Sequence, residues 1–151
     1  IGLYDAVKRD PRGRVISVSF LALINADQEL KASTDAKEAA WFAYSDLPKL
    51  AFEHEKIIED ALKELRFEIQ TTNIAREILP KQFTLTELQN LYEQILGKKL
   101  DKRNFRKRIK ELGIIKATGI KRRDGAHRPA ELHEFKHKKY RPIKEKIHVF
   151  V

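Results

Sequence analysis

The sequence contains no cysteine and no methionine, and it has a single tryptophan. A chain without cysteine can form neither disulfides nor cysteine-bound zinc or iron–sulfur clusters, and it has no thiol nucleophile. There is also no apolar run of about 18 residues and no signal-peptide pattern, so we expect no membrane span, no export signal and a cytoplasmic protein. Because the chain starts with isoleucine and lacks methionine, we expect further sequence upstream of Ile1.

Acidic and basic residues are unevenly distributed along the chain. Residues 1–79 contain 11 Lys and Arg against 14 Asp and Glu, whereas residues 80–151 contain 20 against 8. The net charge of +9 therefore comes from the second half, and a localised basic domain is typical of a protein that binds a polyanion. A basic membrane-binding surface is the competing interpretation, but it needs exposed apolar side chains opposite the Lys and Arg residues. Here the apolar positions are needed for a core.

The stretch from Leu100 to Ile115 has the features of a helix with one buried face and one basic face. Asp101 can cap its first turn, Leu100 and Phe105 have the spacing of a hydrophobic staple, and Gly113 suits its C-terminal exit. The apolar stripe consists of Phe105, Ile109 and Leu112, and the basic stripe consists of Arg103, Arg106, Lys107 and Lys110. Taken alone, the pattern is equally consistent with a solvated surface helix, so the neighbouring segments decide.

A second helix is predicted immediately upstream, within Phe83 to Gly97. Thr84 and Glu87 form a T-x-x-E capping box ahead of an apolar stripe. Only residues 97–100 separate this helix from the basic one. That is the connection length of a helix-turn-helix, in which the second helix enters the major groove of DNA.

A hairpin is predicted after the basic helix. Ile114 to Thr118 and Ala130 to Phe135 have the composition of its strands, and Asp124-Gly125 is the strongest turn signal in the chain. The basic or potentially basic residues around its tip are Lys121, Arg122, Arg123, His127 and Arg128. Two helices followed by a basic hairpin indicate a winged helix, and a solvated hairpin tip is the alternative.

The first half of the chain is predicted to contain a buried sheet. Val15 to Ile24 is almost continuously apolar, which is typical of a strand covered on both faces. Shorter strands are expected at Leu30 to Ala32 and at Ala39 to Tyr44, and Lys8 to Arg14 is expected to form a loop.

Helical periodicity predicts a helix from about Glu53 to Arg66. Phe67 to Thr72 is expected to be extended or linker-like, and Asn73 can cap a short helix from Ile74 to Leu79. We therefore expect a domain boundary near Thr71.

Several motifs resemble those of Nudix-related transcriptional regulators. In the first half these are Arg9-Asp10-Pro11-Arg12-Gly13-Arg14 followed by VISVSFLAL, Ala40-Trp41-Phe42, Asp46-Leu47-Pro48, and Leu50-Ala51-Phe52 ahead of His54. In the second half they are FTLTELQNLYEQILGKKLDKRNFRKRI and GAHRPAELHEF. The resemblance extends from about Leu3 to Phe135 and implies an α+β chain. Residues 1–70 would be the C-terminal part of a Nudix-like α/β effector-sensing domain, and residues 71–151 a winged helix-turn-helix DNA-binding domain with a basic tail.

The resemblance implies a sequence-specific DNA-binding transcriptional regulator, and we expect a repressor of genes of NAD or sugar metabolism. Its partners would be a double-stranded DNA operator and a small effector, which is ADP-ribose, a related nucleotide sugar or a sugar. A winged helix that binds RNA or another protein remains an alternative.

A homodimer is expected as well, because a two-fold symmetric dimer can read a longer palindromic site. The sheet edge beside Val15 to Ile24 also needs cover from a missing segment or a partner chain. Trp41, Phe42 and Tyr44 are interface candidates, and simple core packing is the competing interpretation of these aromatic residues.

Catalysis is not predicted for this chain. Nudix hydrolases hold magnesium through the closely spaced carboxylates of a Nudix box, G-x5-E-x7-R-E-U-x-E-E-x-G-U, in which U is apolar, and the sequence contains no match. The alternative function is a Nudix-type ADP-ribose pyrophosphohydrolase whose box lies upstream of Ile1. We interpret Glu53, Glu55 and Glu59 as a solvated helix face and His133 and His137 as surface histidines, so neither a metal site nor a cofactor is expected.

The predicted sites are a DNA-binding surface and an effector pocket. The DNA-binding residues are Lys102, Arg103, Asn104, Arg106, Lys107 and Lys110 of the helix and Lys121, Arg122, Arg123, His127 and Arg128 of the wing. Near the start of the second helix, Arg103, Asn104, Arg106 and Lys107 are expected to face bases, and Lys110 a phosphate. The effector candidates, from the resemblance, are Arg9, Asp10, Arg12 and Arg14, for which ion pairs that stabilise the fold are the competing interpretation.

Overall fold

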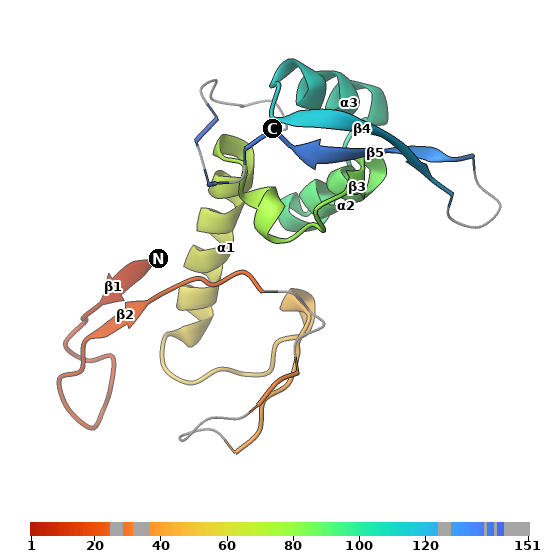
Figure 1. The fold of residues 1–151 in the computed structure, drawn as a ribbon. Coiled ribbons are helices and arrows are strands. Elements are labelled where there is room, and N and C mark those ends of the chain that lie inside the picture. Colours follow the sequence, from red (N-terminus) through yellow and green to blue (C-terminus); the bar gives the residue numbers. More distant parts are fainter. Residues whose placement is uncertain (25–28, 32–36, 124–127, 138, 141, 144–151) are drawn as a thin grey trace. The chain divides into compact units, whose positions relative to one another are not determined.

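The structure is a computed structural model that describes residues 1–24, 29–31, 37–123, 128–137, 139–140 and 142–143 (Figure 1). The chain divides into two compact units, Ile1–Ala61 and Leu62–Val151. Within the described segments, no helix combines the length and the apolar character that crossing a membrane requires.

The first unit contains a two-stranded antiparallel sheet. Strand β1 (Gly2–Tyr4) pairs with β2 (Ser17–Ser19), with Gly2 opposite Ser19 and Tyr4 opposite Ser17. A 3-10 helix, η1 (Tyr44–Asp46), follows, and helix α1 (His54–Thr71) begins in this unit. The hydroxyl of Tyr4 donates a hydrogen bond to Asp60 of α1 at 3.1 Å.

The prediction of a long buried strand from Val15 to Ile24 is wrong. Only Ser17–Ser19 pairs, because the short β1 offers no further partner. The apolar side chains around it are largely exposed, and Phe20 has an exposed fraction of 84%. A strand needs both a partner along its edge and a packed layer on its face, and apolar composition by itself supplies neither.

Two smaller predictions for this unit also fail. Residues 39–44 form no strand, and their chain leads into η1 instead, while the described part of the predicted strand at Leu30 to Ala32 has no strand structure. Trp41, Phe42 and Tyr44 are each more than half exposed, so the interpretation of these aromatic residues as core is wrong for the structure described. The expected loop at Lys8 to Arg14 is confirmed.

Helix α1 is longer than predicted and ends at Thr71 rather than at Arg66. Its last turns are held by the fully buried side chain of Ile69. The side chains of Gln70, Thr71 and Thr72 also donate hydrogen bonds back to backbone carbonyls one turn earlier. Burial and these local bonds keep the segment helical, although its polar and β-branched residues predict an extended conformation for Phe67 to Thr72.

The segment after α1 also departs from the expectation. A 3-10 helix, η2 (Ile74–Glu77), replaces the predicted helix that would end at Leu79. Asn73 stands at its N-cap position without capping it, and its amide donates instead to the backbone carbonyl of Lys139 at 3.0 Å. The Ile74 N–H is bound by the hydroxyl of Thr72 at 3.2 Å.

The second unit contains a winged helix. Its elements are β3 (Phe83–Thr84), α2 (Leu85–Leu96), α3 (Lys102–Glu111), β4 (Ile115–Arg122) and β5 (Ala130–Phe135). The strands form an antiparallel sheet in the order β3-β5-β4, with β4 and β5 side by side in Figure 1. The predicted helices and the return strand are confirmed. The outgoing strand β4 ends at Arg122 rather than at the predicted Thr118. Its pairing with β5 shifts register between Ala117 and Lys121, around Gly119 with φ of 77°, and then resumes.

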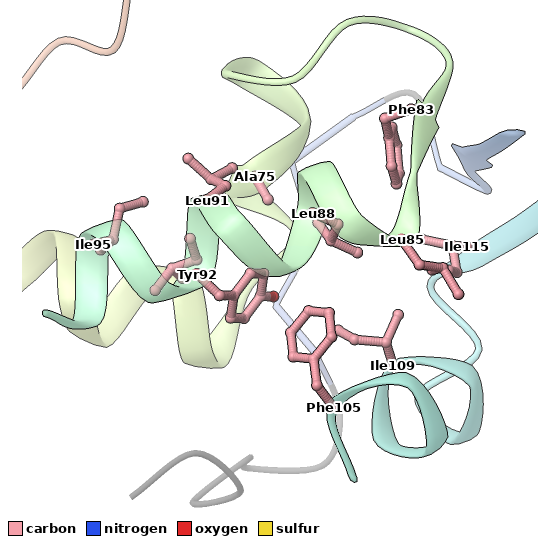
Figure 2. Packing of buried hydrophobic residues seen from close by; sticks show 11 residues of the cluster. Ala75, Phe83, Leu85, Leu88, Leu91, Tyr92, Ile95, Phe105, Ile109 and Ile115 are labelled. Atoms are coloured by element: carbon pink, nitrogen blue, oxygen red, sulfur yellow. The ribbon is translucent and has the colours of Figure 1, made fainter. Parts of the chain in front are cut away.

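One hydrophobic core lies beneath α2 and α3. Figure 2 shows Phe105 and Ile109 of α3 directed toward Leu88 and Tyr92 of α2. The rings of Tyr92 and Phe105 meet edge to face, with centroids 5.3 Å apart. The inner side of α3 is thus committed to packing, and the fold class is α+β, as predicted.

Candidate nucleic-acid interface

The turn between α2 and α3 is fixed by Glu93, a residue that the sequence analysis did not single out. Its carboxylate accepts hydrogen bonds from the Lys99 ammonium at 2.8 Å and from the Leu100 N–H at 3.0 Å. Gln89 donates to the same carboxylate and to the Leu100 carbonyl, each at 3.0 Å. The bond from Lys99, with those from Leu100 and Gln89, lowers the pKa of Glu93 to about 2.

Helix α3 begins as its sequence predicts. The Asp101 carboxylate accepts a hydrogen bond from the Asn104 N–H at 2.8 Å, which satisfies one of the free N–H groups of the first turn. Gly113 ends the segment with a left-handed φ of 62°. The Asp101 and Glu93 contacts thus fix the start of the helix that carries the basic face, and Gly113 lets the chain turn away at its end.

The basic side of α3 faces away from the core. Its exposed members are Lys102, Arg103, Asn104, Lys107 and Lys110. Lys107 lies 4.0 Å from Glu111, an i,i+4 pair in which the lysine side chain is 75% exposed. Such a pair restrains a lysine weakly, so these side chains can reach a polyanion.

Arg106 differs from the other predicted base-reading residues because it is half-buried. Its Nη2 donates a hydrogen bond to the Thr86 hydroxyl in the first turn of α2 at 3.2 Å. Its Nε is buried and finds no hydrogen-bond partner within the described part of the chain. The guanidinium is therefore held against the start of α2.

The described cations of the wing lie where predicted, but Arg122 forms an ion pair with another residue of the protein. Lys121, Arg123 and Arg128 are exposed, and His127 lies outside the described residues. Arg122 donates from Nη2 to Glu87 Oε1 of α2 at 2.6 Å. Partial burial raises the pKa of Glu87, but the hydrogen bonds from Thr84 and Arg122 outweigh that effect and leave the pKa below its usual value.

The predicted effector residues are brought together as two ion pairs. Arg9, whose side chain is 7% exposed, pairs with Glu53, so the interpretation of Glu53 as a solvated residue is wrong. Asp10 is buried and accepts hydrogen bonds from the backbone and guanidinium of Arg12, and these bonds lower the pKa of Asp10 to about 2. Arg14 is exposed. These contacts are the ion pairs of the competing interpretation, and effector binding stays a prediction.

No group of three or more His, Asp or Glu side chains among the described residues is arranged to hold a metal ion. One histidine prediction is wrong, because His133 is only 5% exposed. It lies on the middle strand β5, opposite Phe83 and Ala117, which is why it is covered. Its Nδ1 lies 3.2 Å from the Glu131 carbonyl oxygen. His137 is exposed as expected.

Comparisons with known proteins agree with this geometry. Residues 75–135 match the family model described as the NrtR DNA-binding winged helix domain. The chain is 37% identical over 130 residues to the "ADPR responsive transcriptional repressor NtrR" of Acinetobacter baylyi, covering 85% of this chain and 52% of that protein. It is 52% identical over 63 residues to an "ADP-ribose pyrophosphatase" of Methanocaldococcus jannaschii, covering 42% of this chain and 37% of that protein.

Two solved structures of Shewanella oneidensis NrtR resemble most of this chain. The structure in complex with a 27mer DNA has a TM-score of 0.69 at 28% identity, and the structure described without DNA has a TM-score of 0.71 at 30% identity. Each likeness covers 89% of this chain and 62% of the Shewanella chain. The present chain thus spans about half the length of the repressor of Acinetobacter baylyi.

Proposed function

Because residues 75–135 match the NrtR DNA-binding winged helix domain, we propose that this chain is a sequence-specific DNA-binding repressor of genes of NAD or sugar metabolism. The observation that carries the proposal is the division of α3 into two sides. Phe105 and Ile109 are committed to the core, while the opposite side exposes Arg103, Asn104 and Lys107 beside a basic wing. A helix-turn-helix needs such an outer side to read bases in the major groove.

Each group of basic residues has a separate proposed role. Arg103, Asn104 and Lys107 face base edges, while Lys102 and Lys110 contact phosphates. On the wing, Lys121, Arg123, His127 and Arg128 follow the backbone or the adjacent minor groove, where a narrow groove attracts arginine. Arg106 and Arg122 also contact the DNA, while Thr86 and Glu87 of α2 hold their guanidinium groups in place.

Residues 1–70 are proposed to be the C-terminal part of a Nudix-like effector domain, followed by the winged helix in residues 71–151. The likeness to an ADPR-responsive repressor supports ADP-ribose or a related nucleotide sugar as the effector. Arg9, Asp10, Arg12 and Arg14 are the proposed effector-site residues, since a guanidinium fork suits phosphate oxygens. The exposed apolar residues around Ser17–Ser19 support a further covering segment or a homodimer contact there.

Selection of bound sequences from random duplex DNA by the full-length protein tests the proposal. The expected result is a palindromic consensus whose recovery changes when ADP-ribose is present. Recovery of unrelated sequences, with or without ADP-ribose, would show that the basic surface binds DNA without reading it.

A second candidate is ADP-ribose hydrolysis, favoured by the 52% identity to the Methanocaldococcus jannaschii pyrophosphatase. Incubation of the full-length protein with ADP-ribose and magnesium distinguishes the two functions. Release of AMP and ribose phosphate would support hydrolysis, and intact ADP-ribose together with an altered DNA affinity would support an effector role.

A further inference from the structure

The first turn of α2 contacts both elements of the proposed DNA interface. Thr84 caps the helix, with its hydroxyl accepting from the Glu87 N–H at 3.1 Å. Glu87 returns the bond by accepting from the Thr84 N–H at 2.7 Å. The same Glu87 carboxylate binds Arg122 of the wing, and the neighbouring Thr86 binds Arg106 of α3.

The bond between Glu87 and Arg122 links the distal part of β4 to α2. An exposed ion pair contributes little, partly because two long side chains must be ordered to form it. Here the capping bond already orders the Glu87 side chain, and the side chains of Glu87 and Arg122 are only 37% and 36% exposed. The pair therefore loses less side-chain freedom than an isolated one, and it restrains the wing at the point where β4 ends.

The bond between Thr86 and Arg106 acts on the recognition helix in the same manner. Arg106 offers a long, flexible side chain whose Nε is already shielded from solvent. The Thr86 hydroxyl fixes Nη2 at 3.2 Å, so the guanidinium plane has a defined direction before DNA arrives. A pre-ordered donor loses less entropy on binding than a free one.

We propose that Thr86 and Glu87 are positioning residues of the DNA interface, with Glu87 setting the wing and Thr86 setting the Arg106 guanidinium. The proposal rests on the proposed function, since both residues act through cations that contact DNA. Such a role also explains why the Glu87 carboxylate lies within a surface that is proposed to bind a polyanion.

The substitution Glu87→Gln tests the proposal, because positioning and simple charge removal predict opposite changes in DNA affinity. Glutamine can still complete the capping box, but it loses the charged bond to Arg122. Removing a negative charge from a DNA-binding face strengthens binding if charge alone matters. Loss of positioning instead weakens binding to the selected operator by up to about fivefold, the upper range for an exposed pair. Glu131→Gln, which removes the same charge from β5 of the hairpin, is the matched control and should leave affinity equal or tighter.

The variants Glu87→Gln, Arg122→Gln and their combination form a double-mutant cycle measured by fluorescence anisotropy on the operator. Positioning predicts that Glu87→Gln has no further effect once Arg122 is gone. Tighter binding by Glu87→Gln, or additive effects in the cycle, would overturn the role of Glu87. If the wild-type protein itself shows no operator preference, the proposed function fails instead, so the two failures are distinguishable.

Thr86→Val removes the hydroxyl and keeps the side-chain shape, and Thr86→Ser keeps the hydroxyl. Valine should reduce the ratio of operator to nonspecific affinity by about three- to tenfold, the cost of ordering one long side chain on binding, while affinity for nonspecific DNA stays the same. Serine should restore the ratio. An equal loss in both variants, or no loss in either, would remove Thr86 from the interface.

Discussion

Replacing Phe105 with leucine should destabilise the winged helix by removing the aromatic contact that fastens α3 to α2. The Phe105 side chain is 1% exposed, and its ring meets Tyr92 edge to face with centroids 5.3 Å apart. Loss of such an aromatic pair costs about 0.5–1.5 kcal/mol, and a change of shape at nearly constant volume adds up to about 1.5 kcal/mol. The expected loss in free energy of unfolding is therefore about 0.5–3 kcal/mol.

Urea unfolding followed by circular dichroism measures this loss, with an unchanged dependence on urea concentration if the native state is intact. Phe67→Leu is the matched control, because Phe67 lies on α1 with 59% of its surface exposed. The control should change stability by less than about 0.5 kcal/mol. Equal effects of the two substitutions would refute the argument that the buried inner face holds α3 in place.

Three further predictions concern the turn, the wing and the N-terminal loop. Because the pKa of Glu93 is lowered to about 2 from 4.5, its stabilisation is complete above pH 4.5 and is lost as the pH falls toward 2. Glu93→Gln should therefore flatten the decline of the urea midpoint on acidification, and an unchanged decline would contradict the role of the turn contacts. Neutralising Lys121, Arg123 and Arg128 together should reduce the slope of log affinity against log salt by up to about 0.9 for each phosphate that these side chains neutralise in the wild-type complex, whereas the same slope would exclude the wing from the backbone. Arg12→Ala should weaken calorimetric binding of ADP-ribose to the full-length protein, and equal affinity would leave Arg12 only its ion pair with Asp10.

The winged helix could be predicted from sequence because its signals are local. Thr84 and Glu87 form their capping box, and Asp101 caps α3. These bonds join residues within one helical turn, so spacing alone reveals them. The resemblance to Nudix-related regulators is likewise confirmed, because the likenesses to the Acinetobacter repressor and to Shewanella NrtR extend over both halves of the chain.

The remaining features depend on contacts between distant residues. Val15 to Ile24 has the composition of a buried strand, yet its pairing depends on the three residues of β1. The burial of His133 follows from its place on the middle strand, which no pattern around that residue reveals. The hydrogen bonds that Arg106 donates to Thr86 and Arg122 donates to Glu87 span 20 and 35 positions. Such contacts require the tertiary fold before they can be seen.

In the proposed function, α3 and the wing read a specific DNA sequence. Titration of the full-length protein against the selected operator and against a scrambled duplex of equal length and composition, at physiological salt, tests it most directly. Sequence-specific reading requires at least about a thousandfold tighter binding to the operator. Equal affinity for the two duplexes would contradict it.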